Sequence, residues 1–265
     1  MSHVISIRAF SDNYIWLVCD NNKKFAMIVD PVDGAVVVKT LKKLSIQPVG
    51  VLVTHFHSNH TVGIKDIIDA YPSIPVYGPV KENIPYVTNK LLGNELIKVN
   101  ELDLTFKVIN TFGHTAGHIS YYTVNNAEGG KLFCGDTLLG AGCGRVLGGN
   151  TIDLYNSLQT ISKLPLDTLI YCAHEYTLDN LKFAKWVEPD NKAIGVREIR
   201  ENLLLDIGNP TTPFLLSSEL ETNPFMRVNE DHVIKRLEQI MGQALESSRD
   251  VFAAMRTWKD NAFDI

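Results

Sequence analysis

The chain has 265 residues, of which 45% are hydrophobic, and a formal net charge of −5. This length and composition are typical of a globular protein with one large domain, or with a main domain and a smaller one. The acidic balance gives no extended basic surface, which argues against a nucleic-acid partner. Its four cysteines lie far apart in the sequence, unlike the disulfide framework of a secreted protein, and we expect them to be reduced in the cytoplasm.

The first ten residues contain no basic segment that leads into a long apolar run. No other stretch approaches the roughly 20 apolar residues that are needed to cross a bilayer. We therefore expect a chain with no leader segment and no membrane partner.

Short β-rich runs bounded by Gly, Asp, Asn or Pro predict strands in the first two thirds of the chain. Between some of these runs, the apolar spacing in 63–71 and 153–164 predicts helices. Strands interleaved with helices indicate an α/β layered fold. The predicted strands are 4–10, 14–20, 25–31, 50–54, 75–78, 103–111, 119–124, 131–136 and 168–175.

The pattern changes after the segment "HEYT". Residues 178–187, 192–207 and 232–245 have the apolar spacing of helices and are separated by the Pro-containing segments "GNPTTPF" and "NPF". We therefore place a domain boundary near Tyr176, with a catalytic domain over 1–175 and a mainly helical domain over 176–265.

The segment "VTHFHSNHTVG", residues 53–63, places His55, His57 and His60 within six positions. It follows an apolar strand, and open α/β sheets tend to build their sites at such strand ends. Metal loops of this kind usually carry a carboxylate just before the last histidine, and here that position is held by Asn59. The segment therefore predicts a metal site in which a neutral amide, Asn59, replaces a charged carboxylate ligand.

Three further polar residues follow apolar runs or lie in a Gly-flanked turn: His114, Asp136 and His174. Together with the loop they offer nitrogen and oxygen donors without a thiolate. Such a set suits zinc, iron or manganese in a hydrolytic centre better than a closed structural zinc site. Two metals that share one carboxylate would use all of these donors.

Other single residues are expected to have structural roles. His118 and His232 are isolated, and an isolated histidine is more often a hydrogen-bonded structural residue than a ligand. Cys134 lies two residues before Asp136 in a predicted strand, but a free cysteine is usually a small core residue.

These residues, in this order, resemble the metallo-β-lactamase superfamily, whose pattern His-x-His-x-Asp-His is followed by a histidine, a bridging aspartate and a final histidine. Within it, the chain resembles the hydroxyacylglutathione hydrolase (glyoxalase II) family. The similarity runs nearly end to end, through "DNYIW", "THFHSNH", "GHTAGHI", "FCGDTL", "GCGR", "AHEYTLDNLKFA", "NPFMR" and "MRTWKD". It implies an α/β fold, a metallo-β-lactamase-like αββα sandwich with a C-terminal mainly helical domain.

The resemblance also implies a site with two divalent metal ions, with zinc preferred over iron and manganese. His55, His57 and His114 would bind the first metal, Asn59, His60 and His174 the second, and Asp136 would bridge them. A hydroxide between the metals would attack the thioester of S-D-lactoylglutathione, giving glutathione and D-lactate in methylglyoxal detoxification. Asn59 and Asp136 are therefore the predicted catalytic residues.

The family binds the glutathione part of its substrate through a cationic rim, and carboxylates pair well with Arg and Lys. The matching positions here are Arg145, Tyr176, Arg256 and Lys259. The alternative for Arg256 and Lys259 is that they belong to a solvated helix face.

Two other functions stay open. Persulfide dioxygenases share the fold and use a single iron, although they generally have a shorter C-terminal part. A weakly active glutathione-binding member with an impaired second metal site would also account for Asn59. The leading expectation is a monomeric cytoplasmic enzyme that acts on a small glutathione thioester.

Overall fold

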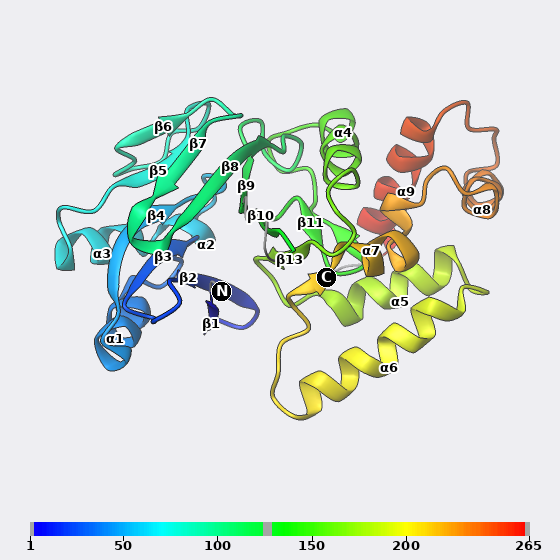
Figure 1. The fold of residues 1–265 in the computed structure, drawn as a ribbon. Coiled ribbons are helices and arrows are strands. Elements are labelled where there is room, and N and C mark those ends of the chain that lie inside the picture. The colour runs from blue at the N-terminus through cyan, green and yellow to red at the C-terminus, as the bar shows by residue number, and fades with distance from the viewer. Residues whose placement is uncertain (1–2, 124–128, 263–265) are drawn as a thin grey trace. The chain divides into compact units, whose positions relative to one another are not determined.

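The computed structural model describes residues 3–123 and 129–262 (Figure 1). The chain divides into two compact units. The first comprises Met1–Asn110 and Ala116–Gly135, and the second comprises Thr111–Thr115 and Asp136–Ile265. Among the described residues, no helix has the length and apolar character needed to span a membrane.

The first unit contains a six-stranded mixed sheet in the order β1-β2-β3-β4-β5-β6. Its first three strands pair antiparallel, and the pairs from β3 to β6 are parallel. The strands are β1 (His3–Ala9), β2 (Asn13–Cys19), β3 (Phe25–Val29), β4 (Gln47–Leu52), β5 (Val76–Pro79) and β6 (Asn89–Leu91).

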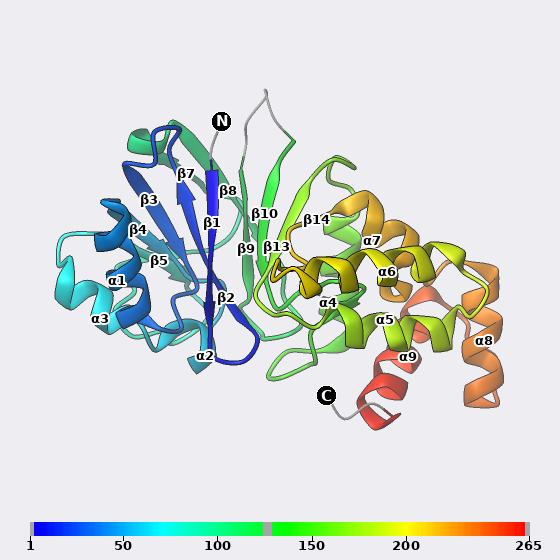
Figure 2. The same ribbon diagram turned by 90° about the horizontal axis from the view of Figure 1, so that it is seen from below.

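Two helices, α1 (Gly34–Leu44) and α3 (Ile64–Ala70), lie side by side against this sheet (Figure 2). Because successive side chains of a strand point to opposite faces, Ile15 and Leu17 of β2 reach the same apolar cluster as Leu41 of α1. The Asp33 side chain begins α1 by accepting a hydrogen bond from the Val36 backbone nitrogen at 3.0 Å. This packing fixes β4, whose C-terminal end leads into the histidine loop.

A second group of strands in this unit is hydrogen-bonded in the order β10-β9-β8-β7. The Tyr121 hydroxyl of β9 donates to the Val53 carbonyl oxygen at 2.8 Å, which joins this group to the residues that follow β4. The remaining elements of the unit are α2 (Ser58–Thr61), β7 (Leu96–Val99), a 3-10 turn η1 (Asn100–Leu102), β8 (Leu104–Asn110), β9 (Ile119–Thr123) and β10 (Lys131–Gly135).

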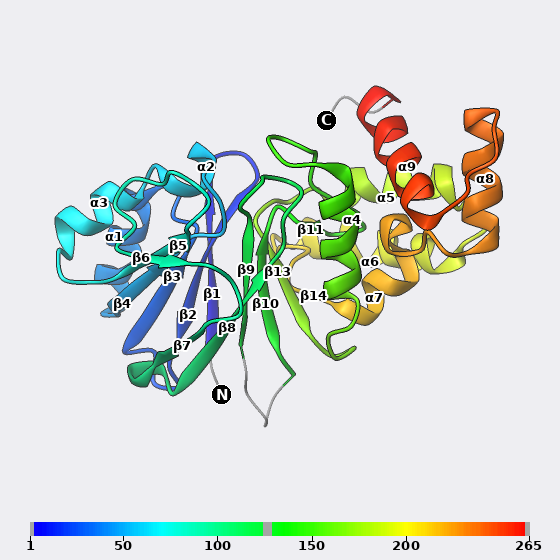
Figure 3. The ribbon, with the colours of Figure 1, turned by 90° about the horizontal axis from the view of Figure 1, so that it is seen from above.

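The second unit is mainly helical, with the two short antiparallel strand pairs β11-β12 and β13-β14. Helices α5 and α6 pack together, and both α4 and α8 contact α9 (Figure 3). Its elements are β11 (Leu138–Leu139), β12 (Gly142–Cys143), α4 (Thr151–Ile161), β13 (Leu169–Cys172), α5 (Thr177–Val187), α6 (Lys192–Asp206), β14 (Phe214–Leu215), α7 (Leu216–Thr222), a 3-10 turn η2 (Pro224–Met226), α8 (Asp231–Met241) and α9 (Ser248–Ala262).

The predicted strands and helices correspond to nine of the strands and five of the helices above. The strand predicted over 119–124 ends at Val124, which lies outside the described residues. Helix α1 and the strands β6 and β7 were not predicted. The boundary near Tyr176 remains a prediction: the compact units divide before Asp136, because Ala141 packs with Leu181, Ala184 and Ile194 of the following helices.

Two glycines permit a close backbone approach in the first unit. A Cβ atom added at Gly63 would lie 2.3 Å from the Gly34 nitrogen and 2.5 Å from the Pro31 carbonyl oxygen. We expect Gly63→Ala to lower the free energy of unfolding by about 2 kcal/mol, since backbone atoms cannot move aside cheaply.

The matched control for this change is Gly195→Ala in α6, where an added Cβ meets nothing within 4 Å. This variant should raise the free energy of unfolding by about 0.4–1 kcal/mol, because alanine loses less backbone entropy on folding than glycine. Urea denaturation of both variants measures the difference. Equal changes of the same sign would contradict the argument.

Candidate metal centre

Three histidines of the loop after β4 come together in the first unit. Nε2 of His55 lies 3.0 Å from Nδ1 of His57, and the ring centroids of His55 and His60 are 4.0 Å apart. His57 precedes the short helix α2, which carries His60. His55 and His60 are fully buried, so the loop holds their ring nitrogens in a region that water does not reach freely.

Asp30 supports two of these histidines from the end of β3. One of its carboxylate oxygens, Oδ2, accepts from Nδ1 of His60 at 3.0 Å and from the Thr54 hydroxyl at 2.7 Å. The Thr54 hydroxyl in turn lies 3.0 Å from Nδ1 of His55. Because a carboxylate only accepts, His60 carries its hydrogen on Nδ1, which leaves Nε2 as the donor for a metal.

Asn59 lies half-buried in α2, between His57 and His60. Its backbone carbonyl oxygen accepts a hydrogen bond from Nδ2 of Asn13 at 3.1 Å. Asn13 belongs to the "DNYIW" segment and is itself buried. The position of residue 59 is thus fixed through its main chain, whichever side chain it carries.

The second unit contains another cluster, in which Asp136 lies between two histidines. Its Oδ2 is 3.4 Å from Nε2 of His114, and its Oδ1 is 3.4 Å from Nε2 of His174. All three residues are buried, and each histidine belongs, with Asp136, to a different group of side chains that could hold a metal ion. Since each carboxylate oxygen faces a different histidine, Asp136 has the arrangement of a bridging ligand.

The segment "GCGR" approaches this second cluster closely. Nδ1 of His114 donates to the Arg145 carbonyl oxygen at 2.6 Å, which again leaves Nε2 as the donor for a metal. A Cβ atom at Gly144 would lie 2.1 Å from the Asp136 carbonyl oxygen and 2.9 Å from Nδ1 of His114. Glycine is therefore required at this position for the contact between Arg145 and His114.

The predicted substrate-binding residues also belong to the second unit. Tyr176 stacks on His174, with ring centroids 4.9 Å apart and an interplanar angle of 4°. The half-exposed Arg145 and the buried Arg256 both approach Oδ1 of Asp260, with N to O distances of 3.7 and 2.7 Å. A carboxylate thus lies between two guanidinium groups.

Lys259 and Arg256 are 2% and 3% exposed, so the alternative in which they form a solvated helix face is wrong. The Lys259 ammonium donates to Oδ1 of Asn180 and lies 5.5 and 5.8 Å from the ring centroids of Phe183 and Phe225. Burial, which is the main cause, and the positive charge of Arg256, which is the next, together lower the pKa of Lys259 to about 7.

The single residues behave as structural groups. Nε2 of His232 is 2.6 Å from a carboxylate oxygen of Glu188, and His118 is fully buried and stacks on His55 with centroids 4.8 Å apart. All four cysteines are free and buried, as the sequence predicted for Cys134. Within the described part of the chain, no cysteine belongs to a cluster that could hold a metal.

Two family models together match almost the whole chain. Residues 9–174 match the metallo-beta-lactamase superfamily, and residues 175–262 match the hydroxyacylglutathione hydrolase C-terminus.

Curated relatives are similar over the same length. A hydroxyacylglutathione hydrolase of Nitrosomonas eutropha is 44% identical over 98% of this chain and 99% of the relative. That of Pseudomonas aeruginosa is 41% identical, again over 98% of this chain and 99% of the relative.

Solved structures share the fold at low identity. A crystal structure of ETHE1 from Myxococcus xanthus superposes with a TM-score of 0.64 at 21% identity, covering 99% of both chains. A metallo-beta-lactamase from Staphylococcus aureus gives a TM-score of 0.64 at 19% identity, covering 97% of this chain and 71% of that chain. The predicted fold class, with its C-terminal helical region, is confirmed.

Identity above 40% over nearly full length is far more specific than these shared folds, and the C-terminal family model extends the match to the helical region. The chain therefore belongs to the hydroxyacylglutathione hydrolase family within the metallo-β-lactamase superfamily.

Proposed function

We propose that this protein is a metal-dependent thioester hydrolase that cleaves S-D-lactoylglutathione and related 2-hydroxyacylglutathiones to glutathione and the free 2-hydroxy acid. Its full-length relatives carry the name of this enzyme. The observation that carries the chemistry is Asp136, whose two oxygens face two different histidines at 3.4 Å.

We propose that the two histidine clusters serve one centre with two divalent metals. The ligands would be His55, His57 and His114 for the first metal, Asn59, His60 and His174 for the second, and Asp136 for both. Nitrogen and oxygen donors without thiolate suit zinc first, with iron and manganese as alternatives. When bound, two such ions activate water and polarise a carbonyl group.

The chain's own groups would orient these ligands. Asp30 and the Arg145 carbonyl oxygen each hold the hydrogen on Nδ1 of a histidine, so that Nε2 points away from its support. Such outer contacts fix ring orientation and raise the basicity of the ligand.

The helical region 176–265, with Arg145, would bind the glutathione part of the substrate. Asp260 already lies as a carboxylate between Arg145 and Arg256, which supports the pair as a carboxylate-binding element. Tyr176, stacked on His174, would line the path between this element and the metal ligands. Lys259 adds positive charge below its pKa of about 7.

We also propose a monomer in the cytoplasm, and four free and buried cysteines fit a reducing compartment. A persulfide dioxygenase is the less supported alternative, because the match to the hydrolase C-terminus spans residues 175–262.

Removal of metal should abolish the hydrolysis of S-D-lactoylglutathione, because the groups around Asp136 are metal-ligating histidines, and the nearby thiols of Cys134 and Cys143 are buried. Turnover should return with zinc, iron(II) or manganese(II), in step with the metal content measured by mass spectrometry. Full turnover by a protein shown to be metal-free would contradict this function.

Arg145→Ala should raise KM for the thioester about tenfold, the equivalent of one charge-assisted hydrogen bond. The kcat should change less than about twofold, since the contact is remote from the reacting carbonyl. Arg249→Ala, an exposed arginine in the first turn of α9, is the matched control and should leave both constants unchanged. An unchanged KM in Arg145→Ala would remove this residue from the substrate site.

Asn59→Asp should raise the affinity for the second metal about tenfold and should raise kcat, because a charged oxygen would replace a neutral one. Metal titration of the apo forms, followed by calorimetry and by turnover, compares the two proteins. Asn83→Asp, at an exposed position of the same unit, controls for the added charge. Equal affinities and rates would show that the amide oxygen is an adequate ligand.

A further inference from the structure

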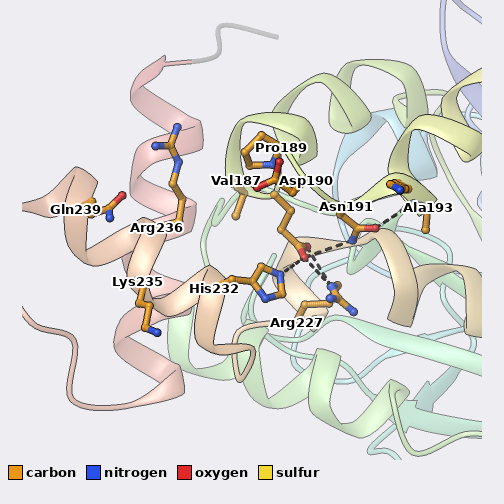
Figure 4. A pocket seen from close by; sticks show the side chains of 12 residues that line it. Val187, Pro189, Asp190, Asn191, Ala193, Arg227, His232, Lys235, Arg236 and Gln239 are labelled. Atoms are coloured by element: carbon orange, nitrogen blue, oxygen red, sulfur yellow. Dashed lines mark hydrogen bonds and ion pairs between the residues drawn. The ribbon is translucent and has the colours of Figure 1, made fainter.

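The helical part of the second unit contains a cavity of about 730 Å³ between α8 and the segment that joins α5 to α6 (Figure 4). None of the candidate metal ligands lines it, and neither do Arg145, Arg256 or Lys259. The proposed hydrolase reaction therefore leaves this cavity without a role.

The base of the cavity is a buried carboxylate held by an arginine and a histidine. Glu188 is 2% exposed, and both of its oxygens lie 3.0 Å from Nε of Arg227. Nε2 of His232 lies 2.6 Å from the same carboxylate (Figure 4). Arg227 also donates to the Leu220 carbonyl oxygen at 3.0 Å, so its guanidinium group has a fixed orientation.

The rim of the cavity has further cationic groups. Nε of Arg236 donates to the Trp186 carbonyl oxygen at 3.1 Å, which anchors this side chain while its terminal nitrogens remain for other partners. Lys192 and Lys235 are exposed, and within residues 3–123 and 129–262 their side chains form no ion pair.

The cavity lining has a net positive charge, whereas the whole chain has a net negative charge. Four lysine and arginine side chains line the cavity together with the carboxylates of Glu188 and Asp190, which gives a formal charge of +2 before His232 is counted. The whole chain carries −5. A concave surface of one sign raises the local concentration of ligands of the opposite sign.

The cavity is too large for a simple ion. Its volume lies in the range of about 300–1,000 Å³ that is typical of small-molecule sites, whereas one water occupies about 30 Å³. Pro189 and Ala193 give it an apolar wall beside the cationic rim. An occupant with an apolar body and an anionic group fits both surfaces.

We propose that this cavity is a second ligand site, which binds a small organic anion through a phosphate or carboxylate group attached to an apolar body. The cationic rim of Lys192, Lys235 and Arg236 attracts and pairs with the anionic group, while Pro189 and Ala193 contact the apolar body. Glu188 fixes Arg227 and His232 at the base of the site.

Calorimetric titration of the full-length, metal-loaded protein tests this site. The probes are AMP for the phosphate source and 2-naphthoate for the carboxylate source, with adenosine and 2-naphthamide as their neutral counterparts. At least one anion should bind at high-micromolar to low-millimolar concentration, at least tenfold more tightly than its neutral counterpart, and more weakly as salt is raised.

The variant is Lys192→Glu/Lys235→Glu, which changes two exposed side chains and should fold normally. It should weaken binding of the anion about tenfold. The control Lys163→Glu/Arg249→Glu makes the same change in net charge at exposed positions outside the cavity and should bind as the parent does.

Three results would overturn the proposal. These are no binding of either anion, equal weakening by the variant and its control, and binding that is lost in the metal-free protein but kept in the variant. The last result would mean that the anion binds at the metals. Hydrolysis of the thioester is measured in parallel, so failure of this site and failure of the hydrolase function are separate outcomes.

Discussion

The Asp30 carboxylate, buried at the end of β3, holds the histidine loop in its conformation. It binds the Thr54 backbone nitrogen at 2.8 Å, the Thr54 hydroxyl at 2.7 Å and Nδ1 of His60 at 3.0 Å. A buried carboxylate is costly unless its oxygens are hydrogen-bonded. The loop supplies these hydrogen-bond donors to Asp30, and Asp30 in turn holds the loop in place. The apolar cluster beneath α1 and α3 supports the same strand end, and a glycine contact where the two helices begin allows them to approach.

The loop histidines and Asp136 could be predicted because their signal is local: each follows a short apolar strand. Asp30, Gly144 and Asp260 could not, since their roles depend on His60, His114 and Arg145, which are distant from them in sequence. Helix α1 was missed because three consecutive valines, 36–38, favour a strand, and the Asp33 cap was the signal that could have corrected it. The burial of Arg256 and Lys259 could not be predicted either, because charged residues usually lie on the solvated face of a helix.

Burial of the charged Lys259 amine lowers the stability of the folded chain. Its pKa of about 7 in the folded chain lies below the ordinary value of 10.5. The unfolded chain therefore binds more protons between these values, and this group makes stability rise with pH across that window. Below pH 7 the full penalty of burying the charged amine remains. A carboxylate bound beside Lys259 and Arg256 would offset this penalty.

The second unit holds two carboxylates between basic side chains, and the two carboxylates differ in burial. Asp260 lies between Arg145 and Arg256, and its pair with the 42% exposed Arg145 side chain is the kind of exposed ion pair that contributes little stability. An incoming carboxylate can therefore compete with it at small cost. The Glu188 side chain, between Arg227 and His232, is fully buried, and removing one partner of a buried pair is strongly destabilising. The difference in burial thus leaves the Arg145–Asp260 pair open to exchange, whereas Glu188 with Arg227 and His232 forms a fixed base for the proposed anion site.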